Sequence, residues 1–372
     1  MPRRAHRGSL AAAAALGYTV LVLYASLYPF TGWRWPPGMA LPTLLVLPWP
    51  RWRDAFDEWS NLAGYLPLGL LVAQVALRAG RGRTAAFLLG AAAPALLSYG
   101  CEVLQQFVPT RHPSAKDWAL NGAGAAAGAA LALALHGLGL ADAWRRRREQ
   151  WFGAGGNGAL ALLALWPAAL LFPTPAPFGV GHLHEPLRAL LVDWLTGVPW
   201  AQAAHALLDG APARDAPLTP AAEAAITTLG LVAPCLLAYA TVQAAARRIA
   251  LGAALLFVAA AAMTLATLLN FGPAHAFAWI GRTTAAAFAA AALLALALAP
   301  AARALVVGCG LVALGALVAA VVQAPADPYF AQTLQAWEQG RFVRFHGLAQ
   351  WVGWLWPYAA IGWFLAQLGR SR

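Results

Sequence analysis

The sequence predicts an all-α fold, a polytopic bundle of transmembrane helices, and three observations support this. First, the 372 residues are 61% hydrophobic and only 10% charged, whereas a soluble domain is usually about half apolar and about a quarter charged. Second, the apolar residues form long runs, many of them close to the ~20 residues with which a helix crosses a bilayer. Third, the basic residues stand at the ends of these runs, where they set membrane orientation.

About ten spans result when ~20 apolar residues are assigned to each crossing. They cover residues 10–30, 59–78, 84–108, 117–138, 156–173, 223–245, 249–271, 282–299, 304–322 and 348–368. Arginines crowd the short turns on one side, as at 78–83, 145–148 and 247–248, whereas the other side has its basic residues spread through longer connections. By the positive-inside rule, both termini are expected to face the cytoplasm.

Three outer connections have compositions typical of a membrane surface. Residues 31–58 are rich in Trp and Pro, as expected at the headgroup interface. Within 174–222, apolar residues recur at helical spacing from Leu187 to Val198, which predicts a helix lying flat on the outer leaflet. The charged segment 323–347 predicts another interfacial helix. The expected domains are a four-helix module at 10–138, a fifth span with its outer segment at 139–222, and C-terminal membrane helices at 223–372.

Some classes of function find no support in the sequence. The formal net charge is +11, but the basic residues flank spans and form no basic helix, so no nucleic-acid partner is expected. The three cysteines lie far apart in apolar segments and indicate neither disulfides nor zinc. His182, His184 and Glu185 alternate as metal ligands can, but no further cluster accompanies them, so no metal and no cofactor are expected.

The stretch from Ser98 to Gly128 gathers polar residues between two predicted spans. Glu102 falls near the outer end of the third span, where an ionisable group is costly unless it is paired or hydrated. Ser98, Glu102, Gln105 and Gln106 share one helix face, and Pro109 ends that helix. Nine residues are candidates for ligand binding: Asp57, Asn61, Glu102, Gln105, Gln106, Arg111, Ser114, Asp117 and Asn121.

A second copy of this pattern lies sixty residues upstream. Asp57, Asn61 and Gly64 repeat the D-x-x-x-N-x-x-G spacing of Asp117, Asn121 and Gly124. Both copies open an outside-to-inside span, so spans one and two and spans three and four are interpreted as parallel repeats. Small residues four apart allow helices to approach closely. The glycines expected to pack helices are Gly64, Gly69, Gly124 and Gly128.

Each polar residue also has a purely structural interpretation. Asp57 and Asp117 stand where an aspartate caps a helix N-terminus. Asn61 and Asn121 suit hydrogen bonds between helices. Glu102 paired with Arg111 would hold the connecting loop. The functional interpretation is that two helix N-termini, Arg111 and the amides meet an anionic group, while the acids orient Arg111 or bind amine or hydroxyl groups.

These motifs resemble the VanZ-like family of bacterial membrane proteins. The resemblance rests on Asp57 and Asn61 with Tyr65-Leu-Pro67-Leu-Gly69-Leu, on Glu102-Val-Leu-Gln105-Gln106-Phe with Pro109, Arg111 and Ser114, and on Asp117, Asn121, Gly124 and Gly128. It covers about residues 20–138. Many relatives carry Lys after the first Asp, whereas this chain has Glu58. The resemblance implies a bacterial plasma-membrane (inner-membrane) protein of the cell envelope and an association with resistance to the glycopeptide antibiotic teicoplanin, and it supplies no mechanism.

Three hypotheses follow. The first is a non-enzymatic membrane protein that binds an anionic envelope lipid, a lipid-linked or glycan precursor, or a glycopeptide at the outer leaflet, through the candidate residues named above. The second is a membrane enzyme acting on a lipid-linked substrate with Glu102 or Asp117 as acid or base. The third is a transporter, which the later spans support least because their sequence contains few charges.

Overall fold

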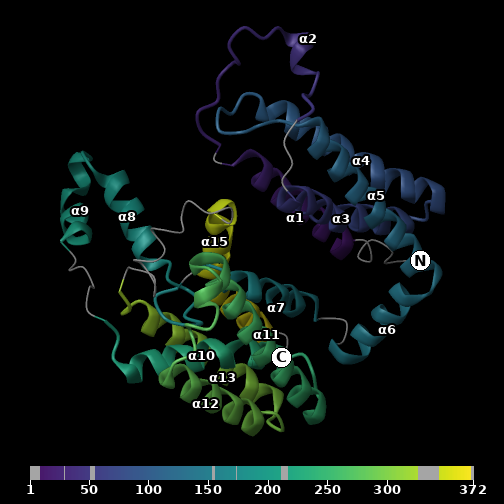
Figure 1. Ribbon diagram of the computed structural model, residues 1–372. Coiled ribbons are helices and arrows are strands. Elements are labelled where there is room, and N and C mark those ends of the chain that lie inside the picture. The colour runs from purple at the N-terminus through teal and green to yellow at the C-terminus, as the bar shows by residue number, and fades with distance from the viewer. Residues whose placement is uncertain are drawn as a thin grey trace. The chain divides into compact units, whose positions relative to one another are not determined.

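The computed structural model describes residues 9–28, 30–50, 55–152, 156–172, 174–210, 217–325 and 343–369 (Figure 1). Throughout these ranges the regular structure is helical, with no strand. The chain divides into two compact units, Met1–Arg147 and Arg148–Arg372. The all-α prediction is confirmed.

The first unit is built on four long helices: α1 (Ser9–Leu27), α3 (Ala55–Arg78), α4 (Arg83–Gln105) and α5 (Ala115–Gly137). A short helix, α2 (Leu41–Leu44), lies between α1 and α3. Helix α6 (Leu140–Phe152) follows α5, and the boundary between the two units falls within it, after Arg147. Helix α3 packs along α5, both pack against α4, and α1 packs against α3 and α4. Figure 1 shows α3, α4 and α5 side by side.

Helices α3 and α5 approach so closely that their contact excludes side chains. A Cβ added at Gly124 would lie 2.1 Å from the Leu62 carbonyl oxygen, and one added at Gly128 would lie 1.9 Å from that of Leu66. A Cβ at Gly69 would lie 2.0 Å from the Ala125 oxygen. Gly64 takes no part in this contact, contrary to its expected packing role, because a Cβ there would meet no heavy atom within 4 Å.

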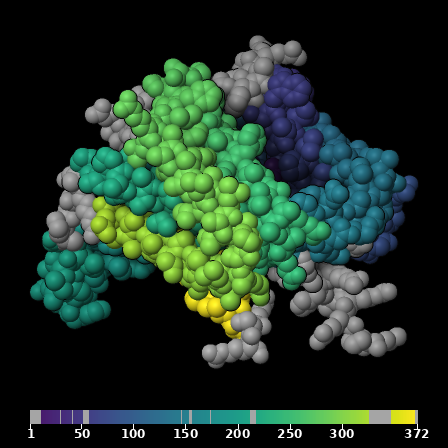
Figure 2. Space-filling view, turned by 90° about the horizontal axis from the view of Figure 1, so that it is seen from below, coloured from purple at the N-terminus to yellow at the C-terminus, as the bar shows by residue number. Residues whose placement is uncertain are grey.

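The second unit surrounds one buried helix. Its elements are α7 (Asn157–Ala169), α8 (His184–Leu195), η1 (Pro199–Ala201), α9 (Gln202–Asp209), α10 (Pro220–Tyr239), α11 (Ala245–Phe271), η2 (Pro273–His275), α12 (Arg282–Leu298), α13 (Arg303–Val321) and α15 (Val343–Gly369). Helix α10 packs against α7, α11, α12 and α13, and every residue from Gly230 to Tyr239 is buried. In the view of Figure 2, residues of α11 to α13 form much of the unit's visible face.

A helix lies at each of the ten predicted spans, and the one at 348–368 is α15. The other nine fall into two groups. Six are long and apolar enough to cross a bilayer: Asp57–Arg78, Arg83–Gln105, Ala115–Gly137, Pro220–Tyr239, Ala245–Phe271 and Arg303–Val321. Three are shorter apolar helices: Ala11–Leu27, Asn157–Ala169 and Arg282–Leu298. The predicted 223–245 span ends earlier, at Tyr239, because the chain turns there before α11 begins. Helix α7, expected to open a separate middle domain, packs against α15 and α10 of the second unit.

The predicted outer connection 174–222 has two distinct parts. Residues 176–182 are buried and irregular, whereas the prediction for this connection concerned only a surface helix from Leu187 to Val198. Apolar Phe178 packs edge-to-face on Trp279 and Phe288, and its carbonyl lies against Gly230. The second part forms α8 and α9, and α8 buries no residue. Of the expected interfacial helix at 323–347, residues 326–342 lie outside the described residues.

Candidate functional site

Glu102 ties the end of α4 to the start of α5. Its side chain is 4% exposed, and its Oε2 accepts a hydrogen bond of 2.8 Å from the Ser114 backbone N–H. The Ser114 Oγ in turn accepts one of 3.1 Å from the Asp117 backbone N–H, so Ser114 is the N-cap of α5. An N-cap of this kind satisfies a donor that the first helical turn leaves unpaired. Glu102 therefore positions the loop and the helix start that carries Asp117.

Arg111 binds backbone carbonyls at the C-terminal end of α1. Its Nε and Nη2 donate to the Tyr28 oxygen at 3.0 and 2.6 Å, and Nη2 also donates to the Ala25 oxygen at 2.9 Å. A cation at a helix C-terminus satisfies its last carbonyls and opposes the negative end of the helix dipole. Arg111 thus holds α1 against the 106–114 loop.

Gln105 and Gln106 hydrogen-bond to the backbone of α1 and α2 near the C-terminal end of α4. Gln105 Nε2 donates to the Ser26 oxygen of α1 at 3.1 Å, and Gln106 Nε2 donates to the Leu44 oxygen of α2. The predicted polar stripe on α4 is therefore used chiefly to hold neighbouring backbone.

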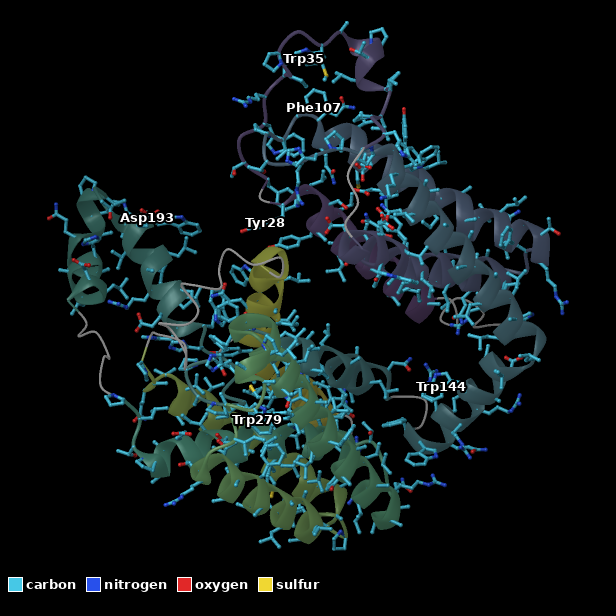
Figure 3. All side chains as sticks on the ribbon, viewed as in Figure 1. Tyr28, Trp35, Phe107, Trp144, Asp193 and Trp279 are labelled. Carbon is cyan, nitrogen blue, oxygen red and sulfur yellow. The ribbon has the colours of Figure 1, made fainter. Side chains whose placement is uncertain are left out.

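Residues 30–50 form a strap across this end, and backbone contacts fix it. The Ala115 N–H donates to the Pro48 oxygen at 2.9 Å, and the Arg34 N–H donates to the Phe107 oxygen at 2.9 Å. Trp35 meets Phe107 edge-to-face, with ring centroids 5.5 Å apart (Figure 3). Trp33, Trp35 and Trp49 expose 43%, 54% and 67% of their surface. Such exposed tryptophans suit a membrane–water interface.

The two copies of the repeat meet at the N-terminal ends of α3 and α5. The Asp57 and Asp117 carboxylates are close enough to interact through their charges, and Asn61 lies beside Asp117. Lys116 forms an ion pair with Glu58, so the residue next to each aspartate is also paired across the two helices. Asp57, Asn61 and Asp117 are each partly exposed. These three residues form the accessible part of the predicted site, which we call the accessible group. Its two carboxylates, Asp57 and Asp117, are called the aspartate pair.

Asn121 lies one turn deeper in the bundle than Asp117. Its side chain is 4% exposed, and its Nδ2 donates to Ser98 Oγ of α4 at 2.9 Å. Its Oδ1 is buried without a hydrogen-bond partner. Asn121 therefore makes the interhelical bond that the structural interpretation expected, and it keeps one acceptor unused.

The structure thus divides the nine predicted binding residues. Five of them hydrogen-bond to backbone and hold neighbouring segments in place: Glu102, Gln105, Gln106, Arg111 and Ser114. Three are partly exposed and form the accessible group: Asp57, Asn61 and Asp117. The ninth, Asn121, is buried beneath that group. The sequence alone did not predict that Lys116 and Glu58 form an ion pair. The sixty-residue repeat could have indicated it, because each of these residues is the neighbour of one of the two repeated aspartates. Within the described residues, no group of three or more His, Cys, Asp or Glu side chains is arranged to hold a metal ion.

The fold and this polar end define a class: a polytopic helical membrane protein with a four-helix N-terminal unit. Within that class, residues 13–136 match the model of the VanZ/LLP1 family, so the N-terminal unit is VanZ-like, as its motifs indicated. No curated protein matches the chain, and no solved structure does.

Proposed function

We propose that the VanZ-like unit binds an anionic envelope lipid or lipid-linked glycan precursor at the outer leaflet, with the aspartate pair and Asn61 meeting amine or hydroxyl groups of its headgroup. The observation that carries this proposal is that the N-terminal ends of α3 and α5 lie together, joined by the Lys116–Glu58 ion pair, so that Asp57 and Asp117 interact through their charges. Two neighbouring carboxylates repel each other, and Asn61, Ser114 and Lys116 offset part of this repulsion at Asp117. An amine or hydroxyl of a headgroup would add a further donor to the pair.

The tryptophan-bearing strap supports a lipid rather than a soluble ligand. Trp33, Trp35 and Trp49 are exposed on a segment bonded to the loop that positions Asp117. Amphipathic rings of this kind sit at the level of lipid headgroups. A lipid anchored there would present its headgroup near the aspartates.

The anionic part of the ligand needs a cationic or donor partner. Arg111 bonds to the carbonyls of α1 and sets the shape of this end. Exposed His112 follows Arg111 in sequence, and exposed Arg34 lies on the strap, where its backbone N–H donates to the Phe107 oxygen. To these two side chains we assign attraction of the anionic group. A bacterial inner-membrane location and an effect on glycopeptide resistance belong to this proposal through the VanZ-like match. Cytoplasmic termini belong to it through the arginines of the short turns.

Native mass spectrometry of the purified full chain tests the proposal. We expect Asp57→Asn/Asp117→Asn to retain several-fold less anionic lipid than the wild type. Glu149→Gln, at an exposed carboxylate of α6, should leave retention unchanged. Equal retention by the wild type and the double variant would rule out the aspartate pair as the binding group.

An acid–base enzyme is the second candidate, because the same pair places two carboxylates together. Paired carboxylates transfer protons in glycosidases and in aspartic proteases. In such an enzyme Asp117→Asn would abolish turnover of a lipid-linked substrate while lipid retention stayed at the wild-type level. Glu102 is less suited to this role, since it is buried and bonded to the Ser114 N–H.

A further inference from the structure

The interior of the first unit contains a polar cluster to which all four long helices contribute. Its members are Ser26 of α1, Tyr65 of α3, Ser98, Cys101 and Glu102 of α4, and Asn121 of α5. Tyr65, Ser98 and Asn121 are 6%, 0% and 4% exposed. In helical bundles, ligand sites are built in this way from side chains on facing helices.

Two buried polar atoms in this cluster are not used by the protein. The Tyr65 hydroxyl lies beside Ser26 and Ser98 but makes no hydrogen bond of regular geometry. Asn121 Oδ1 also has no partner, although the Nδ2 of the same amide bonds to Ser98. An unpaired buried polar group costs about 1–3 kcal/mol. Two such groups beside one serine are therefore unusual in a well-packed bundle.

The chemistry of the two atoms specifies what would satisfy them. A phenol hydroxyl donates or accepts, whereas an amide oxygen accepts only. A ligand hydroxyl can accept from Tyr65 and donate to Asn121. No basic side chain belongs to the cluster, so a neutral group fits it better than a phosphate. Asn121 follows Asp117 of the accessible group by four positions, and Tyr65 follows Asn61 by four. Four positions correspond to about 6 Å along a helix, so the buried pair lies one turn below the accessible group.

We propose that Tyr65 and Asn121 form the inner end of the binding site and bind a hydroxyl group of the ligand headgroup. This inference rests on the proposed function and deepens it by naming the headgroup class, an anionic lipid with a hydroxylated headgroup. The aspartate pair selects the ligand at the surface, and the buried pair then distinguishes a hydroxylated headgroup from a bare phosphate.

Two lipids that differ only in the headgroup provide the test. Phosphatidylglycerol carries headgroup hydroxyls, and phosphatidic acid with the same acyl chains does not. We expect the purified full chain, given equal amounts of both, to retain phosphatidylglycerol about threefold to tenfold better, the range set by one or two hydrogen bonds. Tyr65→Phe removes only the hydroxyl oxygen and should abolish this preference.

Tyr18→Phe is the matched control. The Tyr18 hydroxyl already donates to the Gly64 carbonyl at 2.9 Å, outside the cluster. Its loss should lower the melting temperature and leave the lipid preference intact. Tyr65→Phe should instead keep or raise the melting temperature of the lipid-free protein, because it removes an unpaired buried group.

The outcomes separate the two proposals. If both lipids are retained equally, or if Tyr65→Phe keeps the preference, the hydroxyl site is wrong while lipid binding stands. If neither lipid is retained above the Asp57→Asn/Asp117→Asn background, the proposed function fails. Glycerol 1-phosphate, which has the headgroup without acyl chains, distinguishes the source of the hydroxyl: stabilisation by it that Tyr65→Phe abolishes would support the hydroxyl site but identify a soluble ligand.

Discussion

Gly128 of α5 faces Leu66 of α3 so closely that a Cβ at Gly128 would lie 1.9 Å from the Leu66 carbonyl oxygen. Backbone therefore meets backbone along α3 and α5, and the two aspartates at their N-terminal ends are held on rigid elements. Small residues permit such contacts between membrane helices, where dispersion forces replace the hydrophobic effect.

The two glycines of the repeat provide a matched pair for testing this contact. Gly124→Ala should destabilise the protein by about 1–3 kcal/mol, as overpacking does, because its Cβ would meet the Leu62 oxygen at 2.1 Å. Gly64→Ala should be neutral or stabilising, since its Cβ meets nothing within 4 Å and alanine favours helix. Thermal unfolding in detergent measures both. Equal losses would contradict the asymmetric contact.

The carbonyl contacts of Arg111 predict a structural loss when the guanidinium is removed. Arg111→Ala should destabilise the first unit by about 1–3 kcal/mol and increase hydrogen exchange at the end of α1, where Ala25 and Tyr28 lose their donor. His112→Ala, at the exposed neighbour, should leave exchange unchanged. If Arg111→Ala lowers lipid retention without changing exchange in α1, the arginine acts on the ligand instead.

The Lys116–Glu58 ion pair predicts a reciprocal rescue. Each single reversal, Lys116→Glu or Glu58→Lys, should lower stability by about 1 kcal/mol or less, because the pair is partly exposed. The double reversal should recover most of that loss. Thermal unfolding of all four proteins gives the coupling free energy. A coupling of zero would show that the pair does not help to join α3 and α5.

In the second unit, two adjacent arginines should differ sharply. Arg248 is 4% exposed and donates to the carbonyls of Val242, Ala299 and Ala301. Arg248→Met should therefore cost about 3 kcal/mol or more, since it leaves buried carbonyls unpaired. Arg247→Met should cost under ~1 kcal/mol, because that side chain is exposed and its contacts with described residues are to the Gln150 carbonyl and the Trp151 ring. Similar melting temperatures for the two variants would contradict this assignment.

Membrane orientation is open to a direct measurement. The arginines in short turns predict cytoplasmic termini. A C-terminal green fluorescent protein fusion should then be fluorescent and an alkaline phosphatase fusion at the same site inactive. A phosphatase fusion inserted in the 31–50 strap should be active. The reverse pattern would place the aspartate pair on the cytoplasmic side and exclude an outer-leaflet ligand.

By itself, the amino-acid sequence determined the fold class, the positions of the ten apolar helices and the repeat around Asp57 and Asp117, but it did not predict α2 or α6. These features depend on local composition, because twenty apolar residues demand a hydrogen-bonded helix in a bilayer. The sequence could not predict which glycines contact a neighbouring helix. Gly64 and Gly124 have the same local pattern, and only the packing of α3 against α5 distinguishes them.

Tertiary structure also decided the roles of the polar residues. Arg111 bonds to carbonyls more than eighty positions away, and Glu102 bonds to a backbone N–H across the loop. A sequence pattern shows that such groups require partners but not which partners they find. Likewise the burial of residues 176–182 follows from the helices around them, since their Gly, Pro and Phe content is equally compatible with an exposed loop. The sequence thus located the polar end, and long-range packing decided which of its groups remain accessible for a ligand.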